Sequence, residues 1–330
     1  MVAASVLMPA FRPGGMDVTF AGLRDQTFKD FEFITVDRRY EKRHEQIMRL
    51  AAEYKVNTIH VPEHRRNGKW AVVAAAWNTG FMLAQGEVIL MLPDYAYAPT
   101  GWIEKHLQHH NGRHRLVMSP YLFLNLPPVI KKDGQQVTVP PPAQSSALAR
   151  EVLELTEEVY DEISVFEQPF SESQLAGLAG WPGELQCPRL TIWPDDPDIY
   201  AHVHFRNESM PLSSILVMNG LDENLDRGKS HIDIEFGNRA KLMGCEFIAD
   251  MENMLYILNP RTLFPSMPFG PAEGRWSYND CWNYTKKRLA TGEFQAPNTY
   301  SLRKRREAIK WWREAESVSI IDIPDEEYYG

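Results

Sequence analysis

Hydrophobic and polar positions in the first third of the chain follow a regular alternation of strand and helix signals. Short apolar runs typical of buried strands cover residues 4–11, 31–37, 57–63 and 87–94. Between the second and third runs, apolar residues recur at helical spacing, and residues 70–84 are long and Ala-rich enough for a buried helix. Strand and helix in this order predict an α/β fold with a mostly parallel sheet and helices on both faces.

Each of these four strands closes on a residue that is suited to a ligand site. The carboxyl ends of parallel strands meet at one edge, so we expect Phe11, Asp37, Glu63 and Asp94 to line one crevice. Topology alone does not choose among the many chemistries that such a sheet supports.

The pattern is less regular from Pro127 onward. Residues 127–142 predict a hairpin or loop bounded by prolines, and residues 148–163 an acidic amphipathic helix. A proline-rich irregular stretch follows over 167–200. A second ordered unit over 219–247 has the pattern of a helix that carries acids at its start.

Composition narrows the class of protein. The 330 residues are 44% hydrophobic, which is ample for a large core, and their formal charge of -9 is not that of a non-specific nucleic-acid binder. Cys187, Cys245 and Cys281 lie far apart, in neither zinc-site spacing nor a closed disulfide framework. No run approaches the roughly 18 apolar residues of a membrane span. We therefore expect a soluble, cytoplasmic protein.

Four ordered blocks carry a resemblance to a known family. The segments are SVLMPAF with LRDQTFKDFEFITVD, then NTGFMLAQGEVILML, NGLDE and HIDIEFGNRAKLMG, and they span about 7–102 and 205–250. In this order they resemble the family 2 glycosyltransferases, whose fold is GT-A. The resemblance implies a domain over 1–260, with a nucleotide-sugar half (1–125) and an acceptor half (126–260), followed by a helical extension over 261–330.

The resemblance implies a set of donor-binding residues. Pro9 and Phe11 would flank the nucleotide, and Asp37 would accept a hydrogen bond from its base. The segment at 67–69 would approach the diphosphate, although such a segment is also typical of a plain turn. The full donor set is Pro9, Phe11, Asp37, Asn67, Lys69, Asn78 and Asp94. Asn78 is equally suited to satisfying local backbone groups.

On the acceptor side the resemblance makes Asp233 the catalytic base. A carboxylate facing the acceptor can take its hydroxyl proton as the sugar leaves the nucleoside diphosphate. Glu235 is a second catalytic candidate, but an ion pair with Arg239 four residues on is the simpler interpretation. Asp222 and Glu223 would orient the acceptor or stabilise the start of the helix that carries Asp233.

The metal motif of the family is degenerate in this chain. The family writes Asp-X-Asp after its fourth strand, where this sequence has Pro93, Asp94 and Tyr95, and Asn259 stands where a metal-binding His is common. Three explanations stay open. Asp94 holds Mn²⁺ or Mg²⁺ nearly alone, Lys or Arg side chains replace the metal, or the chain binds a nucleotide sugar without turnover. Weak or absent metal dependence ranks first, and the candidate cations are Lys69, Arg38, Arg39 and Arg66.

Two further patterns have polar or basic character. His202 and His204 are predicted on one face of a strand, where lining an acceptor cleft is favoured over metal binding. Residues 301–316 form a basic helix with Trp311 and Trp312, which would suit anionic lipid or DNA, although a packed helix is the simpler reading.

Together these patterns predict an enzyme that moves a sugar from a nucleoside diphosphate, preferably UDP, to an acceptor hydroxyl with inversion. Retaining enzymes of the same fold share similar acceptor motifs. One alternative keeps the chemistry and makes the acceptor a hydroxymethylated DNA base. The other is a nucleotide-sugar-binding module without turnover.

Overall fold

The computed structural model describes residues 2–12, 14–64, 73–112, 114–124, 129–132, 135–138, 198–228, 230–258 and 276–307. Its strands are β1 (Ala4–Ala10), β2 (Phe31–Asp37), β3 (Thr58–Val61), β4 (Val88–Met91), β5 (Ala96–Tyr97), β6 (Arg115–Met118), β7 (Tyr121–Leu124), β8 (Val129–Lys132), β9 (Gln135–Thr138), β10 (Glu208–Pro211), β11 (Glu246–Ala249) and β12 (Leu255–Leu258). The helices are α1 (Met16–Arg24), α2 (Tyr40–Tyr54), α3 (Val73–Leu83), α4 (Trp102–Gln108), α8 (Leu212–Val217), α9 (Ile232–Leu242) and α10 (Tyr278–Leu289), with 3-10 turns η2 (Ile199–His202) and η3 (Glu223–Arg227).

A seven-stranded sheet in the order β11-β6-β10-β4-β1-β2-β3 forms the centre of the fold. β1 pairs in parallel with both β2 and β4, β2 with β3, and β6 with β11, whereas β10 runs antiparallel to β4 and β6. The predicted mostly parallel sheet is confirmed, and its first four strands lie where the apolar runs placed them. The sequence did not indicate β6, β10 or β11.

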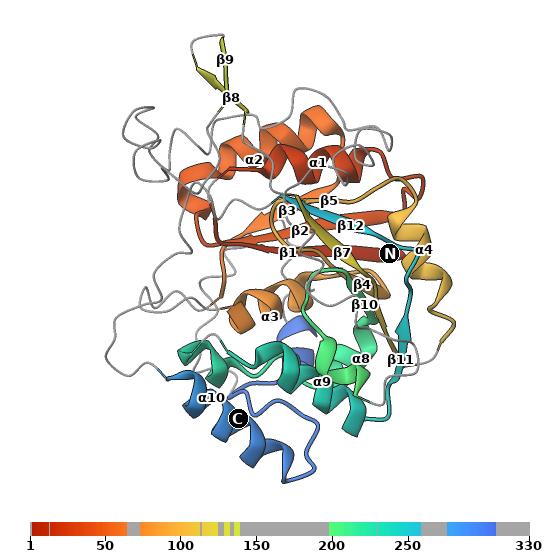
Figure 1. Cartoon of the computed structure of the whole chain (residues 1–330), viewed down its shortest axis with the longest axis vertical. Coiled ribbons are helices and arrows are strands. Elements are labelled where there is room, and N and C mark those ends of the chain that lie inside the picture. The colour runs from red at the N-terminus through yellow and green to blue at the C-terminus, as the bar shows by residue number, and fades with distance from the viewer. Residues whose placement is uncertain are drawn as a thin grey trace.

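Helices cover both faces of this sheet, as Figure 1 shows, with α1 and α2 on one face and α3, α8 and α9 on the other. Each face has its own core. One core is built around Phe20, Phe33 and Trp102, and the other around Phe81, Met210 and Phe236. The helix α3 is buried over most of its length, because Gly80 lets it lie against Leu7 of β1. The predicted helices on both faces are confirmed.

Several residues of the motif blocks fix the amino edge of the sheet, far from any ligand crevice. The Ser5 hydroxyl donates to the Glu32 carboxylate (2.7 Å), which also accepts the Gln85 amide (2.5 Å). Gly86 donates to the Ser5 oxygen (2.8 Å), and its backbone lies against that of Ala4. The acidic and glycine positions of these blocks therefore position the starts of β1, β2 and β4.

Two smaller sheets complete the described structure. The strands β5, β12 and β7 form one, and β8 and β9 pair antiparallel as the hairpin predicted over 127–142. The predicted helix over 148–163 lies outside the described residues. Among the described residues, no helix is both long enough and apolar enough to cross a bilayer.

Strands from both predicted halves join the central sheet. β10 and β11 come from the second half, and they pair with β4 and β6 of the first. The described part of the C-terminal segment packs on the second half, because Ala296 donates to the Met218 carbonyl (2.8 Å). The boundary at residue 260 stays a prediction, since residues 259–275 lie outside the described ranges.

Replacing Gly86 by Ala tests the close approach at the amino edge. A Cβ at this position would lie 2.3 Å from the Ala4 carbonyl carbon and 2.4 Å from the Ser5 nitrogen, both of them backbone atoms of β1. We expect Gly86→Ala to lower the free energy of unfolding by about 3 kcal/mol, measured by urea denaturation. Gly112→Ala is the control, because its Cβ meets nothing within 4 Å, and its positive φ should cost only about 1 kcal/mol. Equal losses in the two variants would contradict this account.

Candidate active site at the carboxyl edge of the sheet

The strand order reverses between β1 and β4, and we refer to the carboxyl edge of the sheet at this point as the crevice. From β1 the chain moves outward to β2 and β3, and then β4 returns to the other side of β1. Pairing of β1 with β4 ends at Leu7 and Met91, whereas pairing with β2 continues to Ala10. In open α/β sheets this reversal point is where ligands bind, at the carboxyl ends of the strands.

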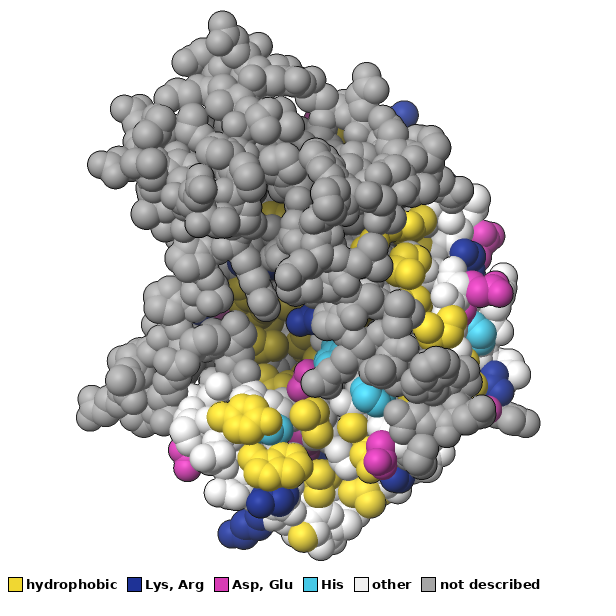
Figure 2. Space-filling model, in the orientation of Figure 1, with side chains coloured by type: hydrophobic (Ala, Val, Ile, Leu, Met, Phe, Trp, Pro, Cys, Tyr) yellow, Lys and Arg dark blue, Asp and Glu magenta, His cyan; other side chains and the backbone are white. Residues whose placement is uncertain are grey.

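Four predicted donor residues lie at this edge. Pro9 is buried in β1, where it is the register partner of Val36, and Phe11 follows β1 and packs against the core beneath the sheet. Asp37 is the last residue of β2, and Asp94 follows β4. Phe11, Asp37 and Asp94, three of the four residues predicted at strand ends, therefore lie at one edge of the sheet. In the middle of the face in Figure 2, hydrophobic side chains lie next to basic, acidic and histidine side chains.

Asp37 is fully buried and holds a network of hydrogen bonds. Arg43 of α2 grips it with two bonds, from Nε (2.5 Å) and Nη2 (2.8 Å), while His60 of β3 and the Arg39 amide add bonds of 3.0 and 2.8 Å. Burial alone would raise the pKa of Asp37, but the Arg43 charge and the His60 hydrogen bond lower it to about 2. These four donors occupy both carboxylate oxygens of Asp37. A nucleotide base could therefore bond Asp37 only by sharing an oxygen with one of these donors or displacing it.

The histidines beside Asp37 extend this network to the edge of the sheet. His60 Nδ1 lies 3.0 Å from His44 Nδ1, and the two rings stack at 5.1 Å between centroids. Burial lowers the pKa of His60, although the hydrogen bond to Asp37 opposes this. A neutral His60 that donates from Nε2 to Asp37 accepts at Nδ1 from His44, which satisfies both contacts.

Asp94 has a cationic partner across the crevice. Arg12, two residues after β1, donates from Nε to the Asp94 carboxylate (3.0 Å) and from Nη2 to its second oxygen. The same Nη2 lies 3.4 Å from the Asp94 backbone oxygen. The strands β1 and β4 are thus bridged by an ion pair beyond the point where their pairing ends.

The divalent ion that the resemblance implies does not fit these residues. Pro93 and Tyr95 supply no carboxylate, and Asp94 is already paired with the Arg12 guanidinium. Within the described ranges, no group of three His, Cys, Asp or Glu side chains could hold a metal ion. Asn259 and Lys69, which bore on the competing explanations, lie outside those ranges, as does Asn67.

Asn78 connects α3 to the acceptor-side motif. Its amide nitrogen donates to the Leu221 carbonyl (3.0 Å) and to Glu223 (2.9 Å), and its oxygen accepts the Leu221 amide (2.8 Å). Asp226 adds to this link, because its carboxylate accepts the Ala74 and Ala75 amides at the start of α3 (2.7 and 3.0 Å). The polar atoms of Asn78 are engaged inside the protein, which matches the alternative interpretation of this residue.

The two acids of the acceptor motif, Asp222 and Glu223, form hydrogen bonds to neighbouring segments of the protein. Asp222 caps η3 through the Asn224 amide (2.9 Å) and accepts the Tyr284 hydroxyl (2.7 Å). Glu223 is buried beside Asn78, with the Tyr300 hydroxyl and His64 Nε2 (3.2 Å) against the same oxygen. These contacts tie the N-terminal half, the motif and the C-terminal segment together.

Asp233 lies in the first turn of α9, and its side chain is 35% exposed. Its carboxylate accepts a hydrogen bond from His204 (3.4 Å) and the Ile234 amide (2.9 Å). Burial would raise the pKa of Asp233, but the His204 contact and the backbone hydrogen bonds lower it below its ordinary value. An ionised and accessible carboxylate at a helix start is what a general base for a hydroxyl requires.

Glu235, two residues on, has a different environment. It is fully buried, and Arg239 donates to it from Nε (2.6 Å) in the i, i+4 pair considered from the sequence. The same guanidinium donates to the carbonyls of Met218 (2.9 Å) and Gly220 (2.8 Å). Because no part of Glu235 reaches the surface, we leave it out of the catalytic set proposed below.

A chain of contacts joins the Asp94 side of the crevice to Asp233. Asp94 is followed by β5, which pairs with β12, and β12 pairs with β7. Tyr121 opens β7, and its ring meets that of His204 edge-on at 6.5 Å between centroids. His204 in turn bonds Asp233. The small sheet therefore connects the donor edge with the base that the resemblance implies.

The predicted strand over 200–205 is wrong. Residues Ile199–His202 form the 3-10 turn η2, and Val203 follows in extended conformation. The two histidines are therefore not on one strand face, and His204 is the one that touches a candidate catalytic residue. The spacing of two histidines is too short a pattern to predict a strand. The nearest strand, β10, begins only at Glu208.

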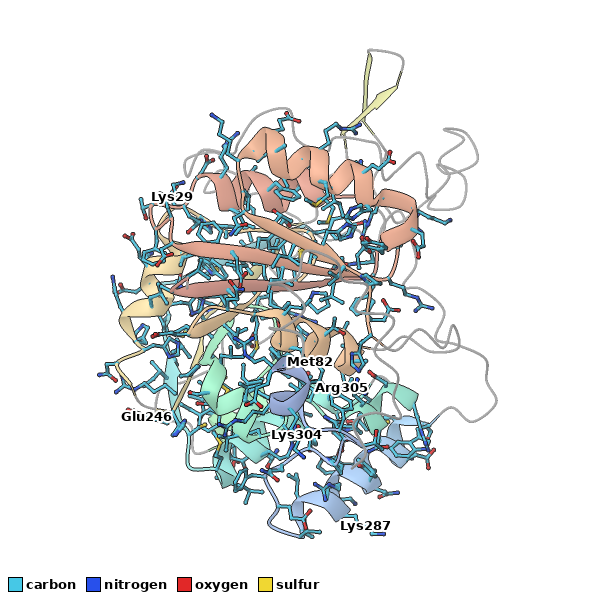
Figure 3. All side chains as sticks on the ribbon, turned by 180° about the vertical axis from the view of Figure 1, so that it is seen from behind. Lys29, Met82, Glu246, Lys287, Lys304 and Arg305 are labelled. Atoms are coloured by element: carbon cyan, nitrogen blue, oxygen red, sulfur yellow. The ribbon has the colours of Figure 1, made fainter. Side chains whose placement is uncertain are left out.

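The described part of the basic C-terminal segment packs onto the protein. Residues 302–307 are helical; Arg305 lies over the Tyr300 ring at 3.9 Å, and Arg306 donates to the Met82 (3.3 Å) and Ala84 carbonyls of the α3 end. Figure 3 shows Lys304 and Arg305 beside Met82. This favours the packed reading for these residues; Trp311 and Trp312 lie outside the described ranges.

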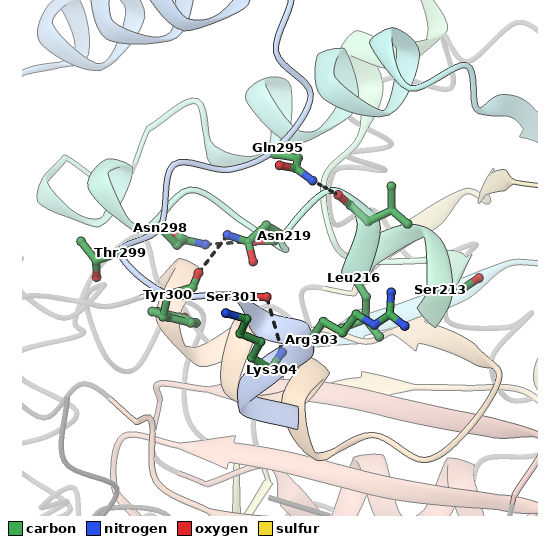
Figure 4. Close-up of a pocket in the computed structure, with 11 residues that line it drawn as sticks. Ser213, Leu216, Asn219, Gln295, Asn298, Thr299, Tyr300, Ser301, Arg303 and Lys304 are labelled. Carbon is green, nitrogen blue, oxygen red and sulfur yellow. Dashed lines mark hydrogen bonds between the residues drawn. The ribbon is translucent and has the colours of Figure 1, made fainter. Parts of the chain in front are cut away.

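A second hollow lies beside this segment. Its wall comes from α8, residues 295–301 and the helical turn that carries Arg303 and Lys304, and Asn219 and Asn298 bond across its floor (Figure 4). None of the residues predicted to bind donor or acceptor lines it. It is separate from the crevice between β1 and β4.

Fold and site define a class of protein: an α/β protein with a mostly parallel sheet and a charged crevice at its reversal point, an arrangement suited to a nucleotide. Residues 5–142 match the family model described as glycosyl transferase family 2. This part of the chain is therefore similar to the family 2 glycosyltransferases. The predicted resemblance and the predicted enzyme class, a glycosyltransferase, are confirmed.

Solved structures of similar shape include three glycosyltransferase structures. They are TarS from S. aureus (12% identity, TM-score 0.49, covering 98% of this chain and 76% of that chain), the mannosyltransferase PcManGT from Pyrobaculum calidifontis with GDP-Man and Mn²⁺ (12%, 0.45, 97% and 77%), and TarS with UDP-GlcNAc (12%, 0.45, 90% and 68%). Among curated proteins, no sequence matches the chain.

Sequence reasoning missed several residues of the site. Arg12, Arg43 and His60 contact the predicted acids at the crevice, and Tyr121 supports His204. A signal existed for Arg12, which directly follows the apolar run over residues 4–11. For Arg43 the signal was weak, because a basic residue in the first turn of a helix is usually solvated.

Acid denaturation tests the Asp37 network. The folded pKa of about 2 lies below the ordinary 3.8, so the ionised carboxylate stabilises the fold above pH 4 by about 2 kcal/mol, which is lost as pH falls through 2. We expect Asp37→Asn to be about 3–5 kcal/mol less stable at pH 7, because it strands the Arg43 charge. That gap should narrow by about 2 kcal/mol between pH 5 and 2. Asp30→Asn, at an exposed position, is the control, and its difference in free energy of unfolding from the wild type should not narrow in this way. A difference for Asp37→Asn that does not change with pH would refute the network.

Replacement of Asn78 separates its structural role from donor binding. Asn78→Ala leaves the Leu221 amide and carbonyl without this partner, and we expect a loss of about 3 kcal/mol in the free energy of unfolding. Asn238→Ala, which removes one bond to the Ile234 carbonyl, should cost at most about 1 kcal/mol. Unchanged stability of Asn78→Ala with weakened donor binding would instead support a direct donor contact.

Proposed function

We propose that the protein transfers a sugar from a nucleoside diphosphate sugar, with UDP as the favoured nucleotide, to an acceptor hydroxyl with inversion. The observation that carries this proposal is Asp233. It is an ionised, one-third exposed carboxylate at the start of α9, connected through His204, Tyr121 and the small sheet to the Asp94 side of the crevice. The family match over 5–142 supports glycosyl transfer as the reaction.

The proposed reaction has one displacement step. The acceptor oxygen attacks the anomeric carbon as Asp233 takes its proton, and the bond from that carbon to the diphosphate oxygen breaks. The nucleoside diphosphate leaves with the electron pair, and the sugar is inverted because attack and departure occur on opposite faces. Asp233, whose pKa lies below the ordinary 3.8, is deprotonated at neutral pH and can accept the proton.

The donor is placed in the crevice between β1 and β4. Phe11 and Pro9 would flank the nucleotide at the end of β1, and Asp37 would act on the base together with Arg43, which holds it. Asn67 and Lys69 would face the diphosphate, and Asp94 would lie beside it. Asn78, Asp222 and Glu223 would act by positioning, since their side chains bond protein groups.

The acceptor class is less constrained than the donor. The hydroxymethylated DNA base rested on the basic segment at 301–316, and Arg305 and Arg306 of its described part pack onto Tyr300 and α3. No observation favours DNA over a glycan or another hydroxyl compound, so we carry forward the hydroxyl acceptor. A glycosyltransferase family match argues against binding without turnover.

A thermal-shift panel of nucleoside diphosphate sugars, with and without Mn²⁺, identifies the donor. The donor that stabilises the protein most is then used in an assay of sugar release to water and to a panel of hydroxyl acceptors. Stabilisation by a donor with no release of nucleoside diphosphate under any condition would favour the binding module and overturn the proposed reaction.

Substitution of Asp233 tests its role as base. We expect Asp233→Asn to lower the rate of transfer by roughly 10²- to 10⁴-fold, the range for a lost general base, while donor affinity changes less than about threefold. Asp250→Asn is the control, because Asp250 also pairs with a histidine, His109 (3.1 Å), away from the crevice. Removing the hydrogen bond with His204→Ala should move the acid limb of the pH–rate profile to higher pH, since this contact lowers the Asp233 pKa. Full activity in Asp233→Asn would remove this residue from the mechanism.

A further inference from the structure

We infer that the guanidinium of Arg12, held by Asp94, supplies the positive charge that faces the donor's diphosphate, in the place where the family resemblance puts a divalent ion. The inference rests on the proposed function, since it assigns a residue to the diphosphate of that donor. Arg12 was not among the cations considered from the sequence.

Arg12 and Asp94 meet at the reversal point of the sheet. Arg12 follows β1 and Asp94 follows β4, the two neighbouring strands whose pairing stops at Leu7 and Met91. Charges at this point face whatever enters the crevice from the carboxyl edge. The acid lies deeper than the base, because the Asp94 side chain is 12% exposed and that of Arg12 is 25% exposed. The positive group is therefore the one directed toward the ligand.

The contact is a two-pronged ion pair. Arg12 uses Nε and Nη2 against the two carboxylate oxygens, and Nη2 also approaches the Asp94 backbone oxygen. This fork fixes the plane of the guanidinium, which a single contact would not do. Asp94 therefore positions the Arg12 cation and does not act as a metal ligand. A metal ion could reach the Asp94 carboxylate only by displacing Arg12.

Tyr95 occupies the position of the second metal-binding acid and supports Arg12 from below. It has a left-handed backbone conformation (φ 65°), and its side chain is buried. The Arg12 guanidinium lies over its ring at 4.6 Å, a cation–π contact. The ring also packs onto Gly15, where a Cβ would lie 2.2 Å from it. The space beside Asp94 is therefore filled by a ring that is committed to Gly15 and Arg12.

The backbone of Arg12 is fixed from a second direction. Arg43 Nη1 donates to the Arg12 carbonyl (2.9 Å), while its other nitrogens hold Asp37. Both ends of the residue are thus positioned, the main chain by Arg43 and the side chain by Asp94. A preorganised cation of this kind stabilises a diphosphate without reorganising when the leaving group takes up charge.

The two possible roles of Asp94 give opposite results when its charge is removed. If Asp94 binds a metal, Asp94→Asn weakens the metal and with it the nucleotide. If Asp94 only holds Arg12, the amide still accepts one hydrogen bond from the guanidinium. The cation then loses the negative charge that competes with the phosphates, so diphosphate affinity is kept or increased.

The experiment measures binding by calorimetry in EDTA and in Mn²⁺, with a nucleoside diphosphate and its nucleoside as probes. The probe is the one of UDP, GDP, CDP and ADP that stabilises the wild-type protein most. In EDTA we expect wild-type diphosphate affinity to stay within about threefold of its value in Mn²⁺. Arg12→Ala should weaken diphosphate binding roughly 10- to 100-fold, as for a lost charge-assisted contact, and leave nucleoside binding unchanged. Asp94→Asn should bind the diphosphate at least as tightly as the wild type.

Two further variants guard against a folding artefact. Arg12→Lys keeps the charge but loses the fork, and it should fall between the wild type and Arg12→Ala. Arg24→Ala removes a comparable Arg–Asp pair, with Asp25 (2.7 Å), at the far end of α1, and it should bind like the wild type. Circular dichroism and thermal unfolding of each variant confirm that it is folded.

The outcomes separate the inference from the proposed function. Loss of diphosphate binding in EDTA together with loss in Asp94→Asn would overturn the inference and restore a metal centred on Asp94, with the proposed function intact. Wild-type affinity in a folded Arg12→Ala would overturn it as well. If the wild-type protein binds none of the four diphosphates with or without Mn²⁺, the proposed function fails, and the inference fails with it.

Discussion

The buried ion pair between Asp37 and Arg43 is the interaction on which the geometry of the crevice depends. Asp37 ends β2, Arg43 is in the first turn of α2, and both side chains are almost wholly buried. Such a pair adds little net stability relative to apolar residues of the same volume, but breaking it leaves a buried charge. Its structural effect comes from its other contacts. Arg43 reaches the Arg12 carbonyl after β1, and Asp37 reaches His60 in β3, so one pair fixes the ends of three adjacent strands.

Contacts between residues far apart in the chain place the acceptor side against the donor side. Asn78 and the start of α3 bond Leu221, Glu223 and Asp226, more than 140 positions along the chain. Such contacts close long loops, whose entropy cost grows only slowly with length. Once formed, they hold residues 221–226, which precede α9, against α3. The segment that leads to Asp233 is therefore positioned by buried amide and carboxylate pairs.

The sequence was a good guide where a local pattern decides the structure. The apolar runs located β1 to β4, because buried parallel strands are continuously hydrophobic, and the acids at their ends did gather at one edge. It failed where partners are distant. The partners of Asn78, Leu221 and Glu223, lie more than 140 positions away, and β10 is too short and mixed to give a strand pattern. The role of Arg12 depends on Asp94, 82 positions away, a partnership that no local spacing reveals.

The family resemblance puts metal-binding acids at the positions of Pro93 and Tyr95, and the surroundings of Tyr95 compensate for the absence of an acid there. Tyr95 removes a negative charge and supplies a ring; the ring needs a residue without a side chain opposite it, which is Gly15, and a cation above it, which is Arg12. The remaining acid, Asp94, then balances that cation when the crevice holds no ligand, so no isolated charge is buried. A guanidinium is protonated at every physiological pH. A crevice built this way keeps its positive group at every physiological pH and at any metal concentration, which a site dependent on a weakly held divalent ion does not.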